Sequence, residues 1–276
     1  MTRISFAKYS GCGNDFIVVD NRQINLAPHP EMVARLCHRQ RGIGADGVIF
    51  LETSSSASFR MRIFNADGSE AEMCGNGIRC LAHFIHSTSD PVVSTFTIQT
   101  MHQEMHVVVN DNIVTVVMPP PTEAIRVQDI YVDEARFFLH TVDTGVPHVI
   151  LFVEDINQSE LFTVAPRIRF HQDFYPRGTN VNFAQVLPNK TVAVRTYERG
   201  VEQETLACGT GAVAVALAAA AAYGIPAPIT IRTRSGDCLS IDFQGDPTKP
   251  NRLVMTGPAV KVYEGLFSIA AKANFE

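Results

Sequence analysis

Two stretches with the same frame, Met73-Cys74-Gly75-Asn76-Gly77 and Ala207-Cys208-Gly209-Thr210-Gly211, decide how this chain folds. Each C-G-x-G follows a polar loop and precedes an apolar run of helical character, at residues 78–85 and 212–217. The unpaired N–H groups at the start of a helix, and the positive end of its dipole, both stabilise a thiolate. Two cysteines in duplicated frames therefore predict two thiols that act together on one substrate.

The elements before each frame repeat as well. A predicted strand at residues 59–64 leads through an acidic loop to the first frame, and a strand at 192–197 leads through another to the second. Glu70 and Glu204 each lie four residues before their cysteine. We therefore expect an α/β fold of mixed α+β type, in two halves that face each other with the cysteines at the seam.

The matching strands further upstream are expected at residues 14–18 and 180–186, because both begin with asparagine. Pro119-Pro120-Pro121 cannot continue a central strand, so a boundary is expected there. The run Ala218-Ala219-Ala220-Ala221-Ala222 leaves little side-chain bulk, and a helix that is apolar all round is buried. A sheet should wrap closely around this second helix.

Bulk properties exclude several classes of protein. The chain has 276 residues, 46% of them hydrophobic and 18% charged, which is typical of a globular enzyme. A net charge of −5 argues against nucleic acid as a partner. No apolar run of signal-peptide length begins the sequence, and the longest internal one, residues 206–223, is too weak for a membrane span. We expect a cytoplasmic protein whose six cysteines are reduced thiols.

The other cysteines are expected to be structural. Cys37, Cys80 and Cys238 lie in helix-like or strand-like runs without a glycine frame and are predicted to be buried. Cys12 also precedes a glycine, but the residues after it are predicted to form a strand and not a helix, so no catalytic role is assigned to it.

Metal and dinucleotide sites are not expected. The sequence has no C-x-x-C or H-x₃-H pair, and His83 and His86 are predicted to be exposed residues of a helix. Residues 42–47 match G-x-G-x-x-G, but they precede a predicted strand where the fingerprint must follow one.

Two opposed thiols can invert a stereocentre without a cofactor. One thiolate takes a proton from one face of a carbon while the other thiol supplies a proton to the opposite face. Two helix N-termini pointing at an α-carboxylate would make that carbon more acidic.

Seven patterns occur in a recognisable order: Gly13-Asn14-Asp15-Phe16, Asn65-Ala66-Asp67-Gly68-Ser69-Glu70, Cys74-Gly75-Asn76-Gly77-Ile78-Arg79-Cys80, Gly145-Val146-Pro147-His148, Gly178-Thr179-Asn180-Val181-Asn182-Phe183, Glu198-Arg199-Gly200 and Ala207-Cys208-Gly209-Thr210-Gly211. Together they resemble the diaminopimelate epimerase family over nearly the whole chain. The related proline and hydroxyproline racemases share the twin cysteines. They usually carry His where Asn76 stands and lack the Glu-Arg-Gly.

The resemblance implies two pseudosymmetric halves, each a mixed sheet curled around a central helix. We place the first at residues 1–118 with a tail at about 264–276, and the second at 119–263. The resemblance also implies an isomerase that needs no pyridoxal phosphate or other cofactor. It would interconvert LL- and meso-diaminopimelate for lysine and peptidoglycan synthesis and would form a homodimer.

Site roles follow from the same resemblance. Cys74 and Cys208 match the acid/base pair, and His148 and Glu198 match positions that tune the two thiols. The positions that match substrate-binding ones are Asn14, Asn65, Gly75, Asn76, Asn180, Glu198, Arg199, Gly209 and Thr210.

Two positions depart from the family pattern. Val146 stands where many members have Asn, and Gly47 where some carry Gln, and neither can replace a side-chain hydrogen bond. The distal specificity is therefore open. The alternatives are a related racemase acting on glutamate or on proline-type substrates, or a thiol-redox or non-catalytic binding protein on the same fold.

Overall fold

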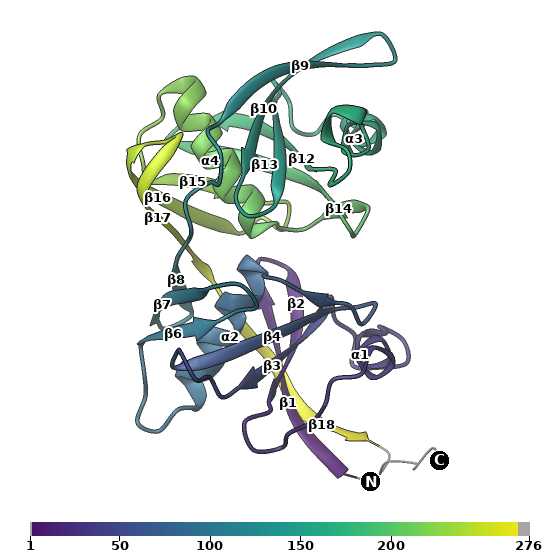
Figure 1. Cartoon of the computed structure of the whole chain (residues 1–276), viewed down its shortest axis with the longest axis vertical. Coiled ribbons are helices and arrows are strands. Elements are labelled where there is room, and N and C mark those ends of the chain that lie inside the picture. Colours follow the sequence, from purple (N-terminus) through teal and green to yellow (C-terminus); the bar gives the residue numbers. More distant parts are fainter. Residues whose placement is uncertain (1, 270–276) are drawn as a thin grey trace. The chain divides into compact units, whose positions relative to one another are not determined.

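The computed structural model describes residues 2–269, which form two compact units. Of these residues, 2–114 and 259–269 belong to unit 1, and 115–258 belong to unit 2 (Figure 1). The fold is sheet-dominated and mixed α+β, as the sequence predicts.

Unit 1 is a mixed sheet with two helices. Its elements are β1 (Thr2–Gly11), β2 (Asn14–Asp20), α1 (Pro30–Cys37), β3 (Gly47–Glu52), β4 (Phe59–Asn65), β5 (Glu70–Ala71), α2 (Gly75–Thr88), β6 (Thr95–Gln99), β7 (Glu104–Asn110) and β18 (Val260–Ile269). The strand β8 (Ile113–Val117) runs across the division between the units.

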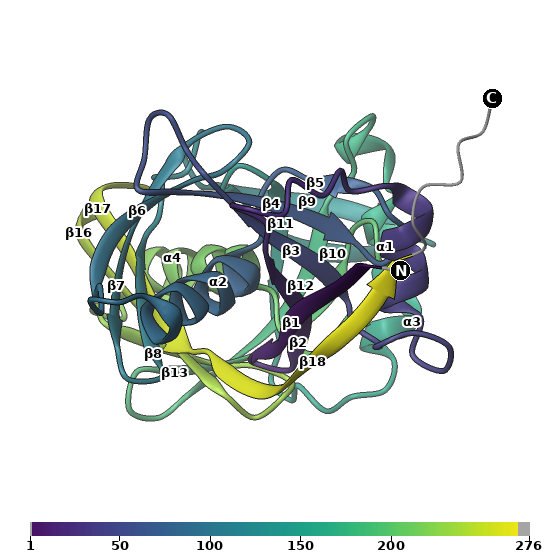
Figure 2. The same ribbon diagram turned by 90° about the horizontal axis from the view of Figure 1, so that it is seen from below.

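The sheet of unit 1 curls around α2. From β18 the order runs antiparallel through β1 to β2, parallel to β3 and antiparallel to β4. Beyond β4 the strand β5 pairs antiparallel and β6 parallel, and β7 follows β6 antiparallel. Helix α2 contacts β1, β2, β3, β4, β7 and β18, so strands lie on several sides of it (Figure 2).

Unit 2 contains the remaining elements. They are β9 (Arg126–Val132), β10 (Ala135–Asp143), β11 (Pro147–Phe152), α3 (Leu161–Arg169), the 3₁₀ turn η1 (Gln172–Phe174), β12 (Asn180–Leu187), β13 (Thr191–Glu198), β14 (Gln203–Thr205), α4 (Gly209–Tyr223), β15 (Ile229–Arg232), β16 (Cys238–Asp246) and β17 (Lys249–Pro258).

Unit 2 repeats the pairing pattern of unit 1. From β9 the order runs antiparallel through β10 to β11, parallel to β12 and antiparallel to β13. Then β14 pairs antiparallel and β15 parallel with β13, and β16 follows β15 antiparallel. The predicted repeat is therefore present as a repeat of topology.

One part of the predicted alignment is wrong. The strand that begins at Asn14 is β2, whose counterpart by pairing order is β11, beginning at Pro147. The strand that begins at Asn180 is β12, the counterpart of β3, beginning at Gly47. The asparagine at the start of both strands is a coincidence, because a single residue type does not identify a strand's place in a sheet.

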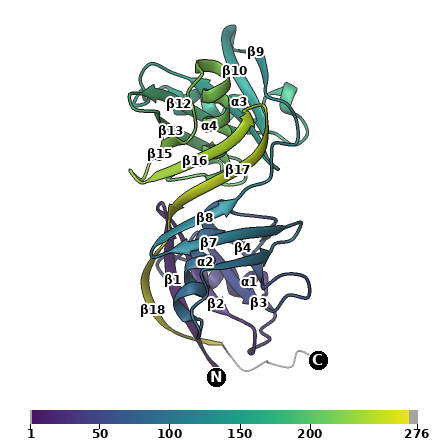
Figure 3. The ribbon, with the colours of Figure 1, turned by 90° about the vertical axis from the view of Figure 1, so that its left-hand side faces the viewer.

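Helix α4 is enclosed over most of its length, but Ala221 and Ala222, at the end of the alanine run, are exposed. Its residues 211–219 are buried without exception, and it contacts β10, β11, β12, β13, β15 and β16; Figure 3 shows β15 and β16 beside it. Gly224 ends the helix in the left-handed conformation, with φ of 64° and its N–H bonded to the carbonyl of Ala220.

Each unit has its own hydrophobic core on the outer face of the sheet, under a short helix. In unit 1, Val33 and Leu36 of α1 pack with Ile17, Val48 and Phe50. In unit 2, Ala165 and Ile168 of α3 are the corresponding helix residues, and they pack in one cluster with strand residues such as Val181 and Phe183. Both faces of the central strands are thus covered, which fixes the strand ends that carry the site residues.

A matching ion pair holds the strand before each cysteine frame. Arg62 donates two hydrogen bonds to Glu70 at 2.7 and 2.8 Å, and Arg195 donates two to Glu204 at the same two distances. The two glutamates that the sequence places four residues before their cysteines therefore tie β4 to β5 and β13 to β14.

Candidate active site

Cys74 occupies the residue immediately before helix α2. Its backbone is extended (φ −140°, ψ 117°), and its sulfur accepts a hydrogen bond from the N–H of Gly77 at 3.4 Å. Gly77 permits this close start, because a Cβ there would lie 2.8 Å from Ile63 Cδ1. The cysteine acts as an N-cap, a position at which an anion is favoured by the helix dipole.

Asn14 and Asn76, both predicted to bind substrate, lie beside Cys74. The thiol of Cys74 donates to Asn14 Oδ1 at 3.7 Å, and Asn76 Nδ2 donates to the same oxygen at 3.2 Å. Asn76 Oδ1 accepts from Arg79 at 2.9 Å. The structure thus brings three predicted residues together at the start of α2.

A cluster of charged residues lies behind Asn14. Asp46 accepts from Asn14 Nδ2 at 2.8 Å, and Arg39 bridges Asp15 and Asp46. Burial opposes ionisation of Asp15, but hydrogen bonds from Arg39 and Lys8 outweigh it and lower the pKa of this carboxyl to about 2. Asn14 is therefore held by Asp46, which Arg39 pairs with beside an ionised Asp15.

Cys208 has the matching position before helix α4. Its backbone is extended (φ −122°, ψ 115°), and its sulfur accepts from the N–H of Gly211 at 3.4 Å. The hydroxyl of Thr210 lies 3.5 Å from the same sulfur, and the Nε2 atom of His148 lies 3.1 Å from that hydroxyl. His148 thus reaches Cys208 through Thr210.

His148 is neutral at physiological pH. Burial, together with the positive charge of Arg199, lowers the pKa of its imidazole to about 3. Its other nitrogen, Nδ1, lies 3.2 Å from Asn182 Nδ2. A cationic role for this histidine is therefore excluded near neutral pH.

Asn180, Glu198 and Arg199 meet at adjoining strand ends. Asn180 Oδ1 accepts from the backbone N–H of Arg199 at 2.8 Å, and Asn180 Nδ2 donates to the carbonyl of Pro147 at 3.1 Å. Glu198 accepts from the hydroxyl of Thr205 at 2.8 Å. Asn180 pairs with His148 in the sheet register, so these residues adjoin the Cys208 group.

Asn65 lies apart from these hydrogen-bond groups. It is exposed at the end of β4, and its amide donates to Ser69 at 3.0 Å. Its role in substrate binding stays a prediction.

Of the remaining cysteines, one differs from the prediction in its burial. Cys37 and Cys80 are buried, and burial raises the pKa of Cys37 to about 12 and that of Cys80 still further. Cys238 was predicted to be buried and is exposed, because it begins the strand β16 beside a turn. Cys12 is buried and receives a hydrogen bond from Arg79 at 3.4 Å.

The predicted exposure of His83 and His86 is also wrong. Both rings are half-buried, since α2 is covered on several sides, and they lie within hydrogen-bonding distance of Tyr9 and the carbonyl of Val93. Among residues 2–269 no group of three or more His, Cys, Asp or Glu side chains could hold a metal ion.

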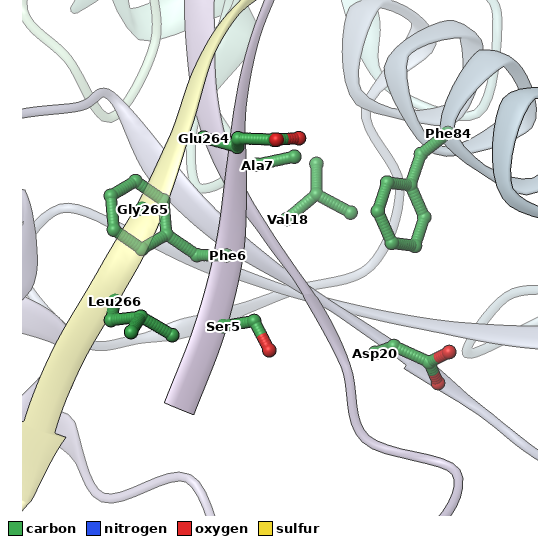
Figure 4. A pocket seen from close by; sticks show the side chains of 9 residues that line it. All are labelled: Ser5, Phe6, Ala7, Val18, Asp20, Phe84, Glu264, Gly265 and Leu266. Carbon is green, nitrogen blue, oxygen red and sulfur yellow. The ribbon is translucent and has the colours of Figure 1, made fainter. Parts of the chain in front are cut away.

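A cavity of about 510 Å³ opens in unit 1 between β1, β2, β18 and α2 (Figure 4). Its charged lining residues are Asp20 and Glu264, which pair with Arg22 and Lys261. None of the predicted site residues lines it, so this cavity is not the candidate active site.

The two departures from the family pattern differ in kind. A Cβ at Gly47 would lie 2.5 Å from the carbonyl oxygen of Phe64, so the packing of the sheet requires glycine here. Val146 is half-buried in the turn before β11. Packing therefore explains the glycine at position 47. It does not explain the valine at position 146, where the hydrogen-bonding side chain of the family pattern is missing.

Three further residues belong to these groups and were not singled out from the sequence as site residues. Arg79 is fully buried beneath Asn76, Asp46 holds Asn14, and Asn182 holds His148. Arg79 could have been noticed as a charge within an apolar helical run. Asp46 and Asn182 gave no comparable signal, because their partners are distant in sequence.

Several solved structures share the fold of this chain. A probable proline racemase from Agrobacterium radiobacter matches with a TM-score of 0.71 at 16% identity, covering 99% of this chain and 94% of that one. A hydroxyproline epimerase from Agrobacterium vitis gives 0.71 at 16%, covering 97% and 91%. A PhzF-family phenazine biosynthesis protein from Bacillus anthracis gives 0.69 at 17%, covering 98% and 100%. The chain thus shares the fold of these three proteins.

Sequence comparison identifies the family. The diaminopimelate epimerase family model matches residues 6–123 and 140–262. The diaminopimelate epimerase of Aquifex aeolicus is 37% identical over 96% of this chain and 98% of its own length, and that of Methanocella arvoryzae is 41% identical over 96% and 97%. The chain belongs to the diaminopimelate epimerase family, and the predicted class of enzyme, an isomerase, is confirmed.

No helix among the described residues is long and apolar enough to cross a membrane.

Proposed function

We propose that this chain is a diaminopimelate epimerase that inverts one α-carbon of LL-diaminopimelate to give the meso form. The observation that carries the proposal is the family match over nearly the whole length, combined with a cysteine N-cap at the start of each central helix. The alternatives, a glutamate or proline-type racemase and a redox or binding protein, have no comparable support.

In the proposed mechanism Cys74 and Cys208 are the acid and the base. One sulfur takes the proton from Cα as the Cα–H bond breaks, and the electron pair remains on the carbon and its carboxylate. The other thiol then delivers its proton to the opposite face. No electrons are exchanged with a cofactor, so neither pyridoxal phosphate nor a metal is required.

The substrate carboxylate would be held by the starts of α2 and α4. The N–H groups of Gly75 and Asn76, and those of Gly209 and Thr210, belong to the first helical turns, where N–H groups lack intrahelical acceptors. Their dipoles stabilise the charge that develops on the carboxylate as the proton leaves. The side chains proposed to bind the rest of the substrate are Asn14, Asn65, Asn180, Glu198 and Arg199.

Wash-in of solvent deuterium at Cα tests the reaction directly. Incubated in D₂O, LL-diaminopimelate should gain one deuterium as it inverts, with no added cofactor and in the presence of a carbonyl-trapping reagent. L-Glutamate and L-proline are the parallel substrates. Faster exchange with either one, or no exchange with any, would refute the proposed substrate.

The cellular setting is part of the same proposal. A cytoplasmic enzyme that serves lysine and peptidoglycan synthesis would act as a homodimer. The apolar residues Val260, Val262 and Leu266, exposed along β18, would supply a surface for the second copy. Sedimentation equilibrium of the wild type and of Val262→Asp should give a dimer and a monomer.

A further inference from the structure

The loop between α1 and β3 contains the glycines that match G-x-G-x-x-G in the sequence. A Cβ at Gly42 would collide with the carbonyl oxygens of Arg35 and Leu36, and Gly44 has a φ of 82°. Glycine is therefore required at both positions for the chain to fold back onto the end of α1. These glycines determine the shape of the loop, which raises the question of what the loop is shaped to hold.

Backbone hydrogen bonds hold the end of this loop on two sides. The N–H of Ala45 donates to the carbonyl of Cys37, the last residue of α1, at 3.1 Å. The N–H of Asp46 donates to the carbonyl of Asp15, in β2, at 2.9 Å. Both bonds use main-chain atoms, so they do not depend on the side chain at position 46. The loop thus fixes the backbone of Asp46 beside the start of β2.

The side chain of Asp46 orients the amide of Asn14. Asp46 Oδ2 accepts from Asn14 Nδ2 at 2.8 Å. A carboxylate paired with an arginine accepts and does not donate, so the NH₂ group of Asn14 must face Asp46 and its Oδ1 must face the other way. That Oδ1 accepts from Asn76 Nδ2, in the first turn of α2, at 3.2 Å. The loop is therefore connected to the start of α2 through a single amide.

Arg39, in the same loop, holds the carboxylate of Asp46. Its Nη2 atom lies 2.7 Å from Asp46 Oδ1 and 3.0 Å from Asp15 Oδ1. Two carboxylates that share one nitrogen would repel each other without this cation between them. Lys8 supplies a second cation, 2.7 Å from Asp15 Oδ2, and also donates to a carbonyl of the loop. Two cations thus balance two carboxylates, which keeps Asp46 aimed at Asn14.

We propose that the loop of residues 38–46 is a positioning element of the active site, with Asp46 and Arg39 as the positioning residues that fix the amide of Asn14. The inference deepens the proposed function and rests on it, because Asn14 and Asn76 belong to the proposed substrate site. Released from Asp46, the amide of Asn14 could turn its NH₂ group toward Asn76 Nδ2. Two donors cannot bond to each other, so the contact with α2 would be lost.

The side-chain amide of Asn14 reports on its orientation directly, without substrate. Heteronuclear NMR resolves its two protons, and Asn14→Ala assigns them. In Asp46→Asn we expect these protons to exchange with solvent at least about tenfold faster, since a hydrogen bond to a charged acceptor is lost. Asp15→Asn is the matched control, because the side chain of Asp15 belongs to the same cluster but does not bond to the side chain of Asn14.

Activity and stability should separate in the same two variants. Asp15 is the less exposed carboxylate, at 18% against 43% for Asp46, and it pairs with both cations. Asp15→Asn should therefore lower the free energy of unfolding more. Asp46→Asn should lower kcat/KM for LL-diaminopimelate more, by about tenfold, because it releases Asn14. Arg39→Lys, which keeps the charge but not the planar fork, should be more active than Arg39→Gln.

Two results would overturn the inference. One is a loss of kcat/KM that follows the loss of stability and is larger in Asp15→Asn than in Asp46→Asn. The other is an exchange rate of the Asn14 amide that Asp46→Asn leaves unchanged. The proposed function is tested separately by the deuterium assay. A wild type that exchanges no substrate hydrogen would refute the epimerase, and the NMR comparison would still decide whether Asp46 orients Asn14.

Discussion

Helices α2 and α4 begin in the same way, yet the surroundings of their cysteines differ. Each sulfur caps its helix and accepts from the third residue at 3.4 Å. In unit 1 the neighbours are the amides of Asn14 and Asn76, which bond to the charged side chains of Asp46 and Arg79. In unit 2 they are the neutral His148 and the hydroxyls of Thr210 and Thr196. The duplicated frame thus provides two thiols at helix starts, and they differ both in the variable residue of the frame, Asn76 or Thr210, and in the residues outside it.

The largest effect should come from removing either cysteine. Cys74→Ala and Cys208→Ala should each lower kcat/KM by about 10² to 10⁴, the usual contribution of a positioned acid or base. Cys238→Ala is the matched control, because that cysteine is exposed and belongs to neither group. Steady-state epimerisation assays decide the matter. Near-normal turnover in either helix-start variant would show that the two frames are not functional equals.

The two units should also respond differently to acid. His148 has a lowered pKa, so the unfolded chain binds its proton first, and stability should fall by about 1.4 kcal/mol per pH unit from roughly pH 6.5 downward toward pH 3. The lowered pKa of Asp15 supports unit 1 above about pH 4, and its contribution of about 2 kcal/mol should be lost only between about pH 4 and pH 2.

Urea denaturation at pH 7, 5 and 3 separates these contributions. Between pH 7 and pH 5, His148→Gln should flatten the loss of stability, while Asp15→Asn should leave its slope unchanged. Between pH 5 and pH 3 the difference between wild type and Asp15→Asn should shrink. A pH slope between 7 and 5 that persists in His148→Gln would assign the acid sensitivity to other groups.

The smallest effect concerns the two departures from the family pattern. Packing explains the glycine at position 47 but not the valine at position 146. We therefore expect looser recognition of the distal end of the substrate because of Val146, in the turn before β11, and not because of Gly47. Val146→Asn should raise discrimination of LL-diaminopimelate over L-glutamate by about tenfold, since a site that hydrogen-bonds a polar group disfavours analogues without it. The measurement is kcat/KM for both substrates. If wild type already rejects glutamate by more than about 10⁵ and the variant changes nothing, Val146 has no such role.

The sequence by itself determined the fold class, the family and the two cysteine frames. Those features are local or periodic: a glycine frame before an apolar helix, an alanine run that marks a buried helix, and strands with clear apolar patterns. The ends of β4 and β13 were predictable for the same reason, since each leads directly through its loop to a helix.

Only the tertiary structure decided which strands correspond and what surrounds each sulfur. The match of Asn14 with Asn180 was wrong because sheet position depends on pairing partners far away in the chain. Asp46 lies 32 residues from Asn14, and Asn182 lies 34 residues from His148. The direction of a hydrogen bond depends on which atoms each partner presents in space, so local sequence could supply the two thiols but not the difference between them.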